Sequence, residues 1–126
     1  MGATTDYKEF AVTFLKMLSA GHAKKAFELH VGPGFKHHNP HFPGDQDVLA
    51  AAMDESAREF PKRTHEILLV ISDGDLVAVH SRLKLTPEHD PLSVVHIMRF
   101  ENGKVAELWD VVQFSVENSP NENGMF

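Results

Sequence analysis

The sequence contains no cysteine and only 12 lysine and arginine residues in 126. Without cysteine the chain can form no disulfide bond, no zinc–thiolate site and no thiol nucleophile. The scattered basic residues and the net charge of −6 disfavour nucleic acid and anionic membranes as partners, since both bind clustered lysine and arginine. No apolar run approaches the roughly 18 residues of a membrane-spanning helix. We therefore expect no nucleic-acid partner and no membrane segment.

The composition is that of one folded domain. Hydrophobic residues make up 42% of the chain and charged residues 24%, which is typical of a globular protein and not of a disordered one. A chain of this length can bury about two thirds of the surface that its unfolded form exposes. The first residues, MGATTDYKEF, lack the basic and apolar stretches of a secretory signal. We expect a single domain over residues 1–126, located in the cytoplasm.

Apolar residues at three- and four-residue spacing predict two helices near the N-terminus. The first covers residues 5–19, with Thr5 near its N-cap and Gly21 as its stop. The second covers residues 22–30 and is ended by Gly32-Pro33-Gly34, a strong breaker. These patterns place helical structure at the start of the chain.

A loop and a third helix follow. FKHHNPHFPGD is rich in proline, glycine and asparagine, which indicates a short extended piece followed by a loop. Asp45 or Asp47 can cap the next helix, and Pro61 follows its end. The helical part of the chain therefore ends near residue 60.

The second half of the chain has strand-like patterns. Asp73-Gly74 and Asn102-Gly103 are typical of tight hairpins. Helices followed by an antiparallel meander predict an α+β fold, because the apolar face of the sheet needs the helices as a cover. The predicted strands cover residues 65–72, 76–86, 93–101 and 104–115.

Three ionisable residues interrupt otherwise apolar strands. They are His80 in DLVAVHSRL, His96 in SVVHIMRF and Asp110 in VAELWDVVQF. A buried charge without a partner is costly, so such residues are tolerated where they pair with each other or line a wet or ligand-filled cavity. The pattern predicts a polar pocket inside the sheet. The alternative is that some of these residues face solvent, since antiparallel sheets usually have one wet face.

Two turns are compatible with the sequence at Asn102-Gly103. A three-residue loop places His96 opposite Leu108 and keeps Asp110 on the same face as His96. A two-residue turn moves the register by one residue, so that Asp110 points to the other face. We favour the three-residue loop because it gathers the histidine and the carboxylate, where each can offset the desolvation of the other.

The last two predicted strands are apolar on both faces. An exposed apolar patch of that size rarely stays bare. We therefore expect one face to cover the helices and a cavity, and the other to form a homodimer through the sheet. The residues concerned are Val95, Ile97, Val105, Trp109 and Val111.

Three segments together resemble the SnoaL-like proteins of the nuclear transport factor 2-like superfamily. They are FKHHNPHFPG, GDLVAVHSRL and VVHIMRFENGKVAELWDVVQ, and the resemblance runs from about Phe35 to the terminal NENGMF. It implies a cone-shaped α+β barrel, in which three N-terminal helices pack on a curved antiparallel sheet around a deep apolar pocket. Some relatives are polyketide cyclases that catalyse aldol closure by acid–base chemistry without a cofactor. Others are ketosteroid isomerases, limonene epoxide hydrolases, dehydratases or non-catalytic binding modules, so the fold alone assigns no reaction.

The resemblance also identifies individual positions. His38 matches the histidine of the family's His-Asn-Pro motif, and Asp110 matches the aspartate of its Trp-Asp motif. Two positions differ. His96 stands where many relatives have aspartate before an Ile-Phe-Arg segment, and Leu108 stands where they have histidine before Trp-Asp. A histidine still faces a carboxylate if His96 and Asp110 meet across the hairpin.

We predict a cofactor-independent enzyme that acts on a small apolar carbonyl compound by aldol-type cyclisation, isomerisation or dehydration. His96 and Asp110 are the expected acid–base pair, with His38 at the pocket mouth as a third catalytic group and His80 as a ligand-binding group. The alternative is a non-catalytic binding module with the same pocket. The expected apolar wall, suited to a ring-shaped or aliphatic ligand, consists of Met98, Trp109, Phe100 and Phe14.

Three histidines crowd the loop after the second helix. His37, His38 and His41 could bind a divalent metal, and Asp45 or Asp47 could complete such a site. The loop lacks the His-x-x-x-His spacing of a helical metal motif. We therefore predict an ordinary loop, with no metal and no other cofactor.

Overall fold

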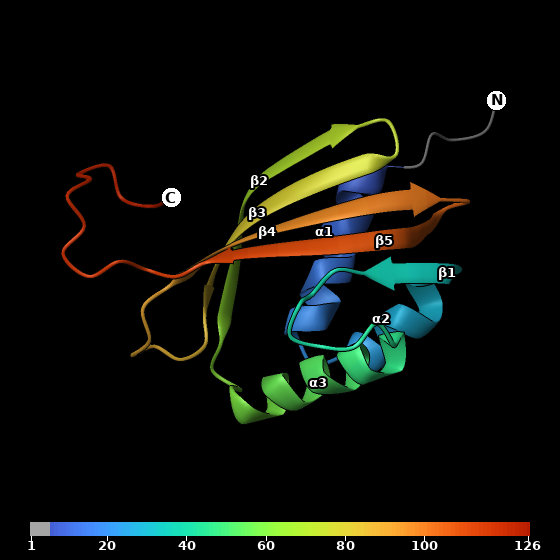
Figure 1. Cartoon of the computed structure of the whole chain (residues 1–126), viewed down its shortest axis with the longest axis horizontal. Coiled ribbons are helices and arrows are strands. Elements are labelled where there is room, and N and C mark those ends of the chain that lie inside the picture. The colour runs from blue at the N-terminus through green and yellow to red at the C-terminus, as the bar shows by residue number, and fades with distance from the viewer. Residues whose placement is uncertain (1–5) are drawn as a thin grey trace.

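Three helices pack on one face of a five-stranded sheet in the computed structural model, which describes residues 6–126 (Figure 1). This confirms the predicted α+β class and the order of helices before the meander. Within the described residues, no helix combines the length and apolarity needed to cross a bilayer. The helices are α1 (Tyr7–Ser19), α2 (Ala23–His30) and α3 (Gln46–Glu59). The strands are β1 (Val31–His37), β2 (Thr64–Asp73), β3 (Leu76–Lys84), β4 (Leu92–Glu101) and β5 (Lys104–Gln113).

The helix ends follow local sequence signals. Asp6 caps α1, and its side chain accepts a hydrogen bond from the backbone N–H of Glu9 at 3.2 Å. Asp45 caps α3 in the same way, by accepting from the N–H groups of the first turn. The cap predicted at Thr5 lies outside the described residues. Gly21, the predicted stop, has a φ of +88°, a conformation that favours glycine after a helix.

Helix α2 takes its cap from another helix. Its own N-cap residue, His22, makes no side-chain capping bond. Asp54 of α3 replaces it: Oδ1 accepts from the N–H of Ala23 at 2.6 Å and Oδ2 from that of Lys24 at 3.1 Å. Asp54 is buried, and its charge is favourable at the positive end of the α2 dipole. This contact joins the N-terminus of α2 to α3.

Strand β1 begins earlier than the extended piece that the sequence predicts. Gly32-Pro33-Gly34 follows the end of helix α2, as expected of a breaker, but it already lies inside the strand, which continues into the start of FKHHNPHFPGD. The sheet order is β1-β5-β4-β3-β2, and β1 pairs in parallel with β5 with an irregular register between Val31 and Lys36. Proline is tolerated there because β1 is an edge strand, where a missing N–H need not break the ladder. The other four strands form the predicted antiparallel meander.

The hairpin between β4 and β5 has the two-residue turn. Asn102 (φ 52°) and Gly103 (φ 75°) occupy the turn, and Glu101 pairs with Lys104. Positive φ at both central positions gives a turn whose twist matches that of the flanking strands. The three-residue loop that we favoured from the sequence is therefore wrong.

A β-bulge next to this turn restores the predicted face. Arg99 pairs with Glu107, and the pair nearer the turn leaves Ala106 as the extra residue. The register beyond the bulge moves by one, so His96 lies directly opposite Asp110. The two residues share a face as predicted, but Asp110 rather than Leu108 is the partner of His96.

The hydrophobic core lies between the helices and the end of the sheet that carries this turn. Aromatic and aliphatic residues from the three helices and the inner face of β3, β4 and β5 fill it. The core includes Phe14, Leu15, Phe27, Leu49, Val77, Val79, Met98, Phe100, Val105 and Leu108.

Candidate functional site

A pocket of about 250 Å³ lies at the other end of the sheet, between its inner face and helices α1 and α3. Most of its lining is apolar, as in small-molecule sites generally. The apolar residues are Leu15, Leu18, Phe42, Leu49, Ala52, Met53, Leu83, Leu92, Val94 and Val112. The polar residues are Ser19, Asn39, Ser56, Arg63, His65, His96 and Asp110.

His96 and Asp110 both line this pocket from adjacent strands. No hydrogen bond joins their side chains within the described part of the chain, and His96 Nδ1 is buried without a partner. Burial, and then the neighbouring His65, lower the pKa of His96 to about 4. The imidazole is therefore neutral at pH 7. The expected mutual compensation between imidazole and carboxylate is not observed.

Asn39 holds Asp110 in place. Its Nδ2 donates to Asp110 Oδ2 at 3.0 Å, while its Oδ1 accepts from the backbone N–H of His41 at 2.9 Å. The Asn39 N–H donates to His37 Nδ1 at 3.2 Å, so the other ring nitrogen of His37 carries the hydrogen that it donates to the carbonyl oxygen of Pro43 at 2.8 Å. The amide is thus oriented from both sides. Asp110 Oδ1 has no hydrogen bond within residues 6–126.

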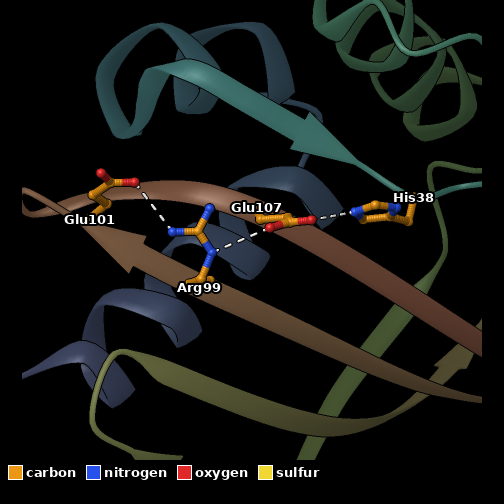
Figure 2. Close-up of polar contacts among 4 residues, drawn as sticks. All are labelled: His38, Arg99, Glu101 and Glu107. Carbon is orange, nitrogen blue, oxygen red and sulfur yellow. Dashed lines mark hydrogen bonds and ion pairs between the residues drawn. The ribbon is translucent and has the colours of Figure 1, made fainter.

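His38 belongs to a polar network outside the pocket (Figure 2). Its Nε2 lies 2.6 Å from Glu107 Oε2, and Arg99 Nε donates to Glu107 Oε1 at 3.3 Å. Arg99 Nη1 also contacts Glu101 Oε2 at 3.2 Å. The hydrogen bond from His38, and then that from Arg99, lower the pKa of Glu107. This network ties the loop after β1 to the hairpin.

The predicted position of His38 at the pocket mouth is therefore wrong. Its ring stacks on Trp109 with the centroids 5.0 Å apart. Trp109 leaves β5 on the face opposite to that of Asp110, since neighbouring strand residues alternate. The next residue, Asn39, enters the pocket in place of His38. The motif histidine and the motif asparagine thus serve opposite faces of the sheet.

His80 also lies on the outer face of the sheet, so its predicted place in the pocket is wrong. Its Nε2 is hydrogen-bonded to Ser93 Oγ at 2.9 Å, and its ring lies near that of Phe126. The guanidinium of Arg82 lies 5.3 Å from the centre of the Phe126 ring. Alternation along β3 places Val79 and Ser81 in the interior and turns His80 outward.

None of the four residues predicted to form the apolar wall lines the pocket. Phe14, Met98 and Phe100 are buried in the core, at the hairpin end of the sheet. Trp109 lies on the outer face. Strand periodicity indicates which side chains share a face, but it does not show how far along a strand a cavity extends. On β4 only Leu92, Val94 and His96, in the first half of the strand, line the pocket.

The sequence interpretation missed His65, which also lines the pocket. His65 Nδ1 lies 2.5 Å from Ser19 Oγ, and the Ser19 hydroxyl donates to the carbonyl oxygen of Leu15 at 3.1 Å. In that arrangement the Nδ1–H of His65 donates to Ser19. Burial, then the charges of Arg63 and Lys16, lower the pKa of His65. His65 is therefore a second neutral imidazole in the pocket.

Arg63 is the remaining ionisable group of the lining. Its Nη2 donates to Ser56 Oγ at 2.7 Å and its Nε to the carbonyl oxygen of Phe60 at 3.4 Å, at the end of α3. Burial lowers its pKa. Among residues 6–126 no carboxylate lies within ion-pair distance of it.

Comparison of the sequence with models of known protein families gives one match. The model of the SnoaL-like domain matches residues 11–108. The chain belongs to the SnoaL-like family. The match confirms the resemblance read from the sequence and covers most of α1, the other two helices, the loop after β1 and the sheet up to Leu108. No curated protein sequence matches this SnoaL-like chain.

Solved structures share its fold. One is a nuclear transport factor 2-like protein of unknown function from Cytophaga hutchinsonii, with a TM-score of 0.68, 11% identity and coverage of 90% of this chain and 95% of that one. Another is IdmH from Streptomyces antibioticus, a candidate polyketide cyclase (TM-score 0.65, 14% identity, 84% and 91% covered). A third is AclR from Streptomyces galilaeus, a candidate hydroxylase (TM-score 0.65, 18% identity, 85% and 81% covered). These likenesses support the cone-shaped α+β barrel.

The three histidines of the loop in this SnoaL-like chain make separate contacts. His37 bonds to Pro43, His38 bonds to Glu107, and His41 is exposed. Within the described residues, no three histidine or carboxylate side chains gather as metal ligands. The loop orients Asn39 instead.

Proposed function

We propose that this SnoaL-like chain is an acid–base enzyme that removes a proton from the carbon next to the carbonyl of a small apolar compound. The observation that carries the proposal is that His96 and Asp110, which are cross-strand neighbours in β4 and β5, both line one apolar pocket. One oxygen of Asp110 is held by Asn39 and the other has no hydrogen bond within the described residues. A carboxylate oriented in this way is suited to act as a general base.

Asp110 Oδ1 takes the proton, the electron pair of the C–H bond forms the C=C bond of an enolate, and the charge moves to the carbonyl oxygen. A neutral His96 donates a hydrogen bond to that oxygen. An imidazole whose pKa is about 4 remains neutral at pH 7, so it stabilises the enolate as a hydrogen-bond donor.

Aldol-type cyclisation, isomerisation and dehydration all pass through such an enolate. IdmH, a candidate polyketide cyclase, has the same fold, which supports this group of reactions for the pocket. AclR has the same fold and is a candidate hydroxylase. The choice among reactions therefore rests on the residues of the site, not on the fold.

A non-catalytic binding module is the second candidate. It is favoured by one observation, the lack of a hydrogen bond between His96 and Asp110. An apolar pocket with one oriented carboxylate can also simply hold a ligand.

Proton exchange separates the two candidates. We would incubate the protein with 2-tetralone, an apolar ring ketone, in deuterated water and follow deuterium uptake next to the carbonyl by NMR. The enzyme accelerates uptake, and His96→Gln lowers kcat by tenfold to a hundredfold while KM changes little, because the enolate loses its donor. The control His41→Gln replaces an exposed histidine of the nearby loop and keeps the wild-type rate. Binding of the ketone without faster exchange would instead identify a binding module.

A further inference from the structure

One end of the pocket carries the guanidinium of Arg63, which has no carboxylate within ion-pair distance among residues 6–126. Arg63 precedes β2 and lines the pocket, and His65 follows two residues later. The positive charges of Arg63 and of Lys16 on α1 repel a protonated His65 imidazole and so lower its pKa. The chain as a whole has a net charge of −6, so the two positive charges beside His65, those of Arg63 and Lys16, run against the overall balance. Such a site attracts an anion.

The contacts of Arg63 account for only part of its guanidinium. Its bonds to Ser56 and Phe60 fix the side chain at the C-terminus of α3, where a positive charge is favourable. Both acceptors are neutral, and Nη1 has no hydrogen bond within residues 6–126. A purely structural helix cap would not require the side chain to line an apolar cavity. The two α3 contacts therefore pre-orient the guanidinium, and its remaining N–H groups are available to a ligand.

We propose that the ligand of this pocket carries a carboxylate group that binds to Arg63. The inference rests on the proposed function, since it concerns the same pocket and names its substrate class as a small apolar oxo acid. Arginine suits a carboxylate because its planar donors match both oxygens. Asp110 lies on β5, which β4 and β3 separate from β2, and its charge repels the carboxylate. The acid group is thus directed to Arg63, and the reacting carbon to Asp110.

Binding of such an anion also changes His65. The groups that face this imidazole are Lys16 on α1, Arg63 before β2 and the neutral His96 on β4. A bound carboxylate offsets the two positive charges, so it raises the pKa of His65. An uncharged ligand of the same shape cannot do so.

A matched pair of probes tests the proposal. We would titrate 4-phenylbutyrate and 4-phenylbutyramide, which differ in charge and hardly in shape, into the full chain and measure both dissociation constants and the His65 pKa by NMR. The acid binds about tenfold more tightly than the amide and raises the His65 pKa. Arg63→Gln removes this preference and Arg63→Lys keeps part of it. Arg58→Gln, which removes an exposed arginine of α3, leaves the preference intact.

Several results would overturn the inference. They are equal binding of the two probes, binding of neither at millimolar concentration, a preference that survives in folded Arg63→Gln, or an equal loss in Arg58→Gln. Asp110→Asn keeps the preference for the acid, because it leaves Arg63 in place. A protein that prefers the acid but exchanges no ketone proton would retain this inference and lose the proposed enzyme. A protein that exchanges the proton without the preference would do the opposite.

Discussion

His96 and Asp110 lie directly opposite each other on the inner face of the hairpin because Ala106 bulges out of β5. A regular two-residue hairpin would have turned Asp110 to the outer face. The bulge therefore decides whether the pocket contains a carboxylate. It also explains why the consecutive residues Val105 and Ala106 are both buried.

Protonation of His96 should destabilise the protein below neutral pH. Its pKa is about 4 in the folded chain, whereas an ordinary histidine, as in the unfolded chain, has a pKa of 6.5. Between pH 4 and pH 6.5 the unfolded chain therefore binds more protons than the folded chain. The free energy of unfolding therefore has its full value above pH 6.5. It falls as the pH drops toward 4, by up to about 3 kcal/mol. Burial of His65 acts in the same direction.

Urea unfolding at several pH values measures this dependence. His96→Gln should flatten the slope by nearly one proton, whereas His41→Gln, at an exposed position, should leave it unchanged. An unaltered slope in His96→Gln would show that the imidazole is not held neutral by burial.

Asn39 should matter for rate more than for binding. Asn39→Ala removes the donor that orients Asp110 Oδ2, and we expect a tenfold to hundredfold lower rate of ketone proton exchange at nearly constant KM. His41→Ala keeps the backbone N–H that bonds to Asn39 and should exchange protons at the wild-type rate. A loss in His41→Ala as large as that in Asn39→Ala would mean that the loop acts only through its overall folding.

Asp54 should be a major contributor to stability. Asp54→Ala leaves two N–H groups of α2 without their acceptor, and we expect the free energy of unfolding to fall by about 2 kcal/mol. Glu55→Ala changes the next residue, which is exposed, and should have little effect. Equal effects of the two substitutions in chemical denaturation would rule out the capping role.

We propose that the outer face of the sheet joins two copies of the chain. Apolar side chains remain exposed there, among them Ile71 (63%) and Val111 (59%). Sedimentation equilibrium should give a dimer that Val111→Glu converts to a monomer, because a charge at the centre of an apolar interface loses its hydration. Val116→Glu places the same charge beyond the sheet and should leave the dimer intact. A wild-type monomer at micromolar concentration would contradict the proposal.

Much of the fold could be predicted because it depends on local patterns. Breakers and helical periodicity located all three helices, and the hairpin signals at Asp73-Gly74 and Asn102-Gly103 located the meander. The end of β1 falls in the predicted extended piece, but its parallel pairing and its Gly-Pro-Gly segment could not be predicted, since that segment has no strand propensity of its own. It is extended because β5 offers it a partner.

The site was predictable only in part. The cost of a charge in an apolar strand pointed to His96 and Asp110, and both line the pocket. The same argument failed for His80, because alternation turns it to the outer face, where Ser93 and Phe126 cover it. His65 lies two residues before Ile67 on β2, so its side chain points to the same inner face of the sheet. This alternation along the strand could have identified His65. Arg63 and Asn39 lie in loops, where no periodicity applies.

The most direct test of the account is steady-state proton exchange of 2-tetralone by Asp110→Asn. If Asp110 is the base, kcat falls at least about a hundredfold while KM stays within about threefold, since asparagine keeps the shape and the contact with Asn39 but cannot take the proton. Asp90→Asn, a substitution of an exposed aspartate, controls for the lost charge and should exchange at the wild-type rate. Exchange by Asp110→Asn at the wild-type kcat would contradict the account.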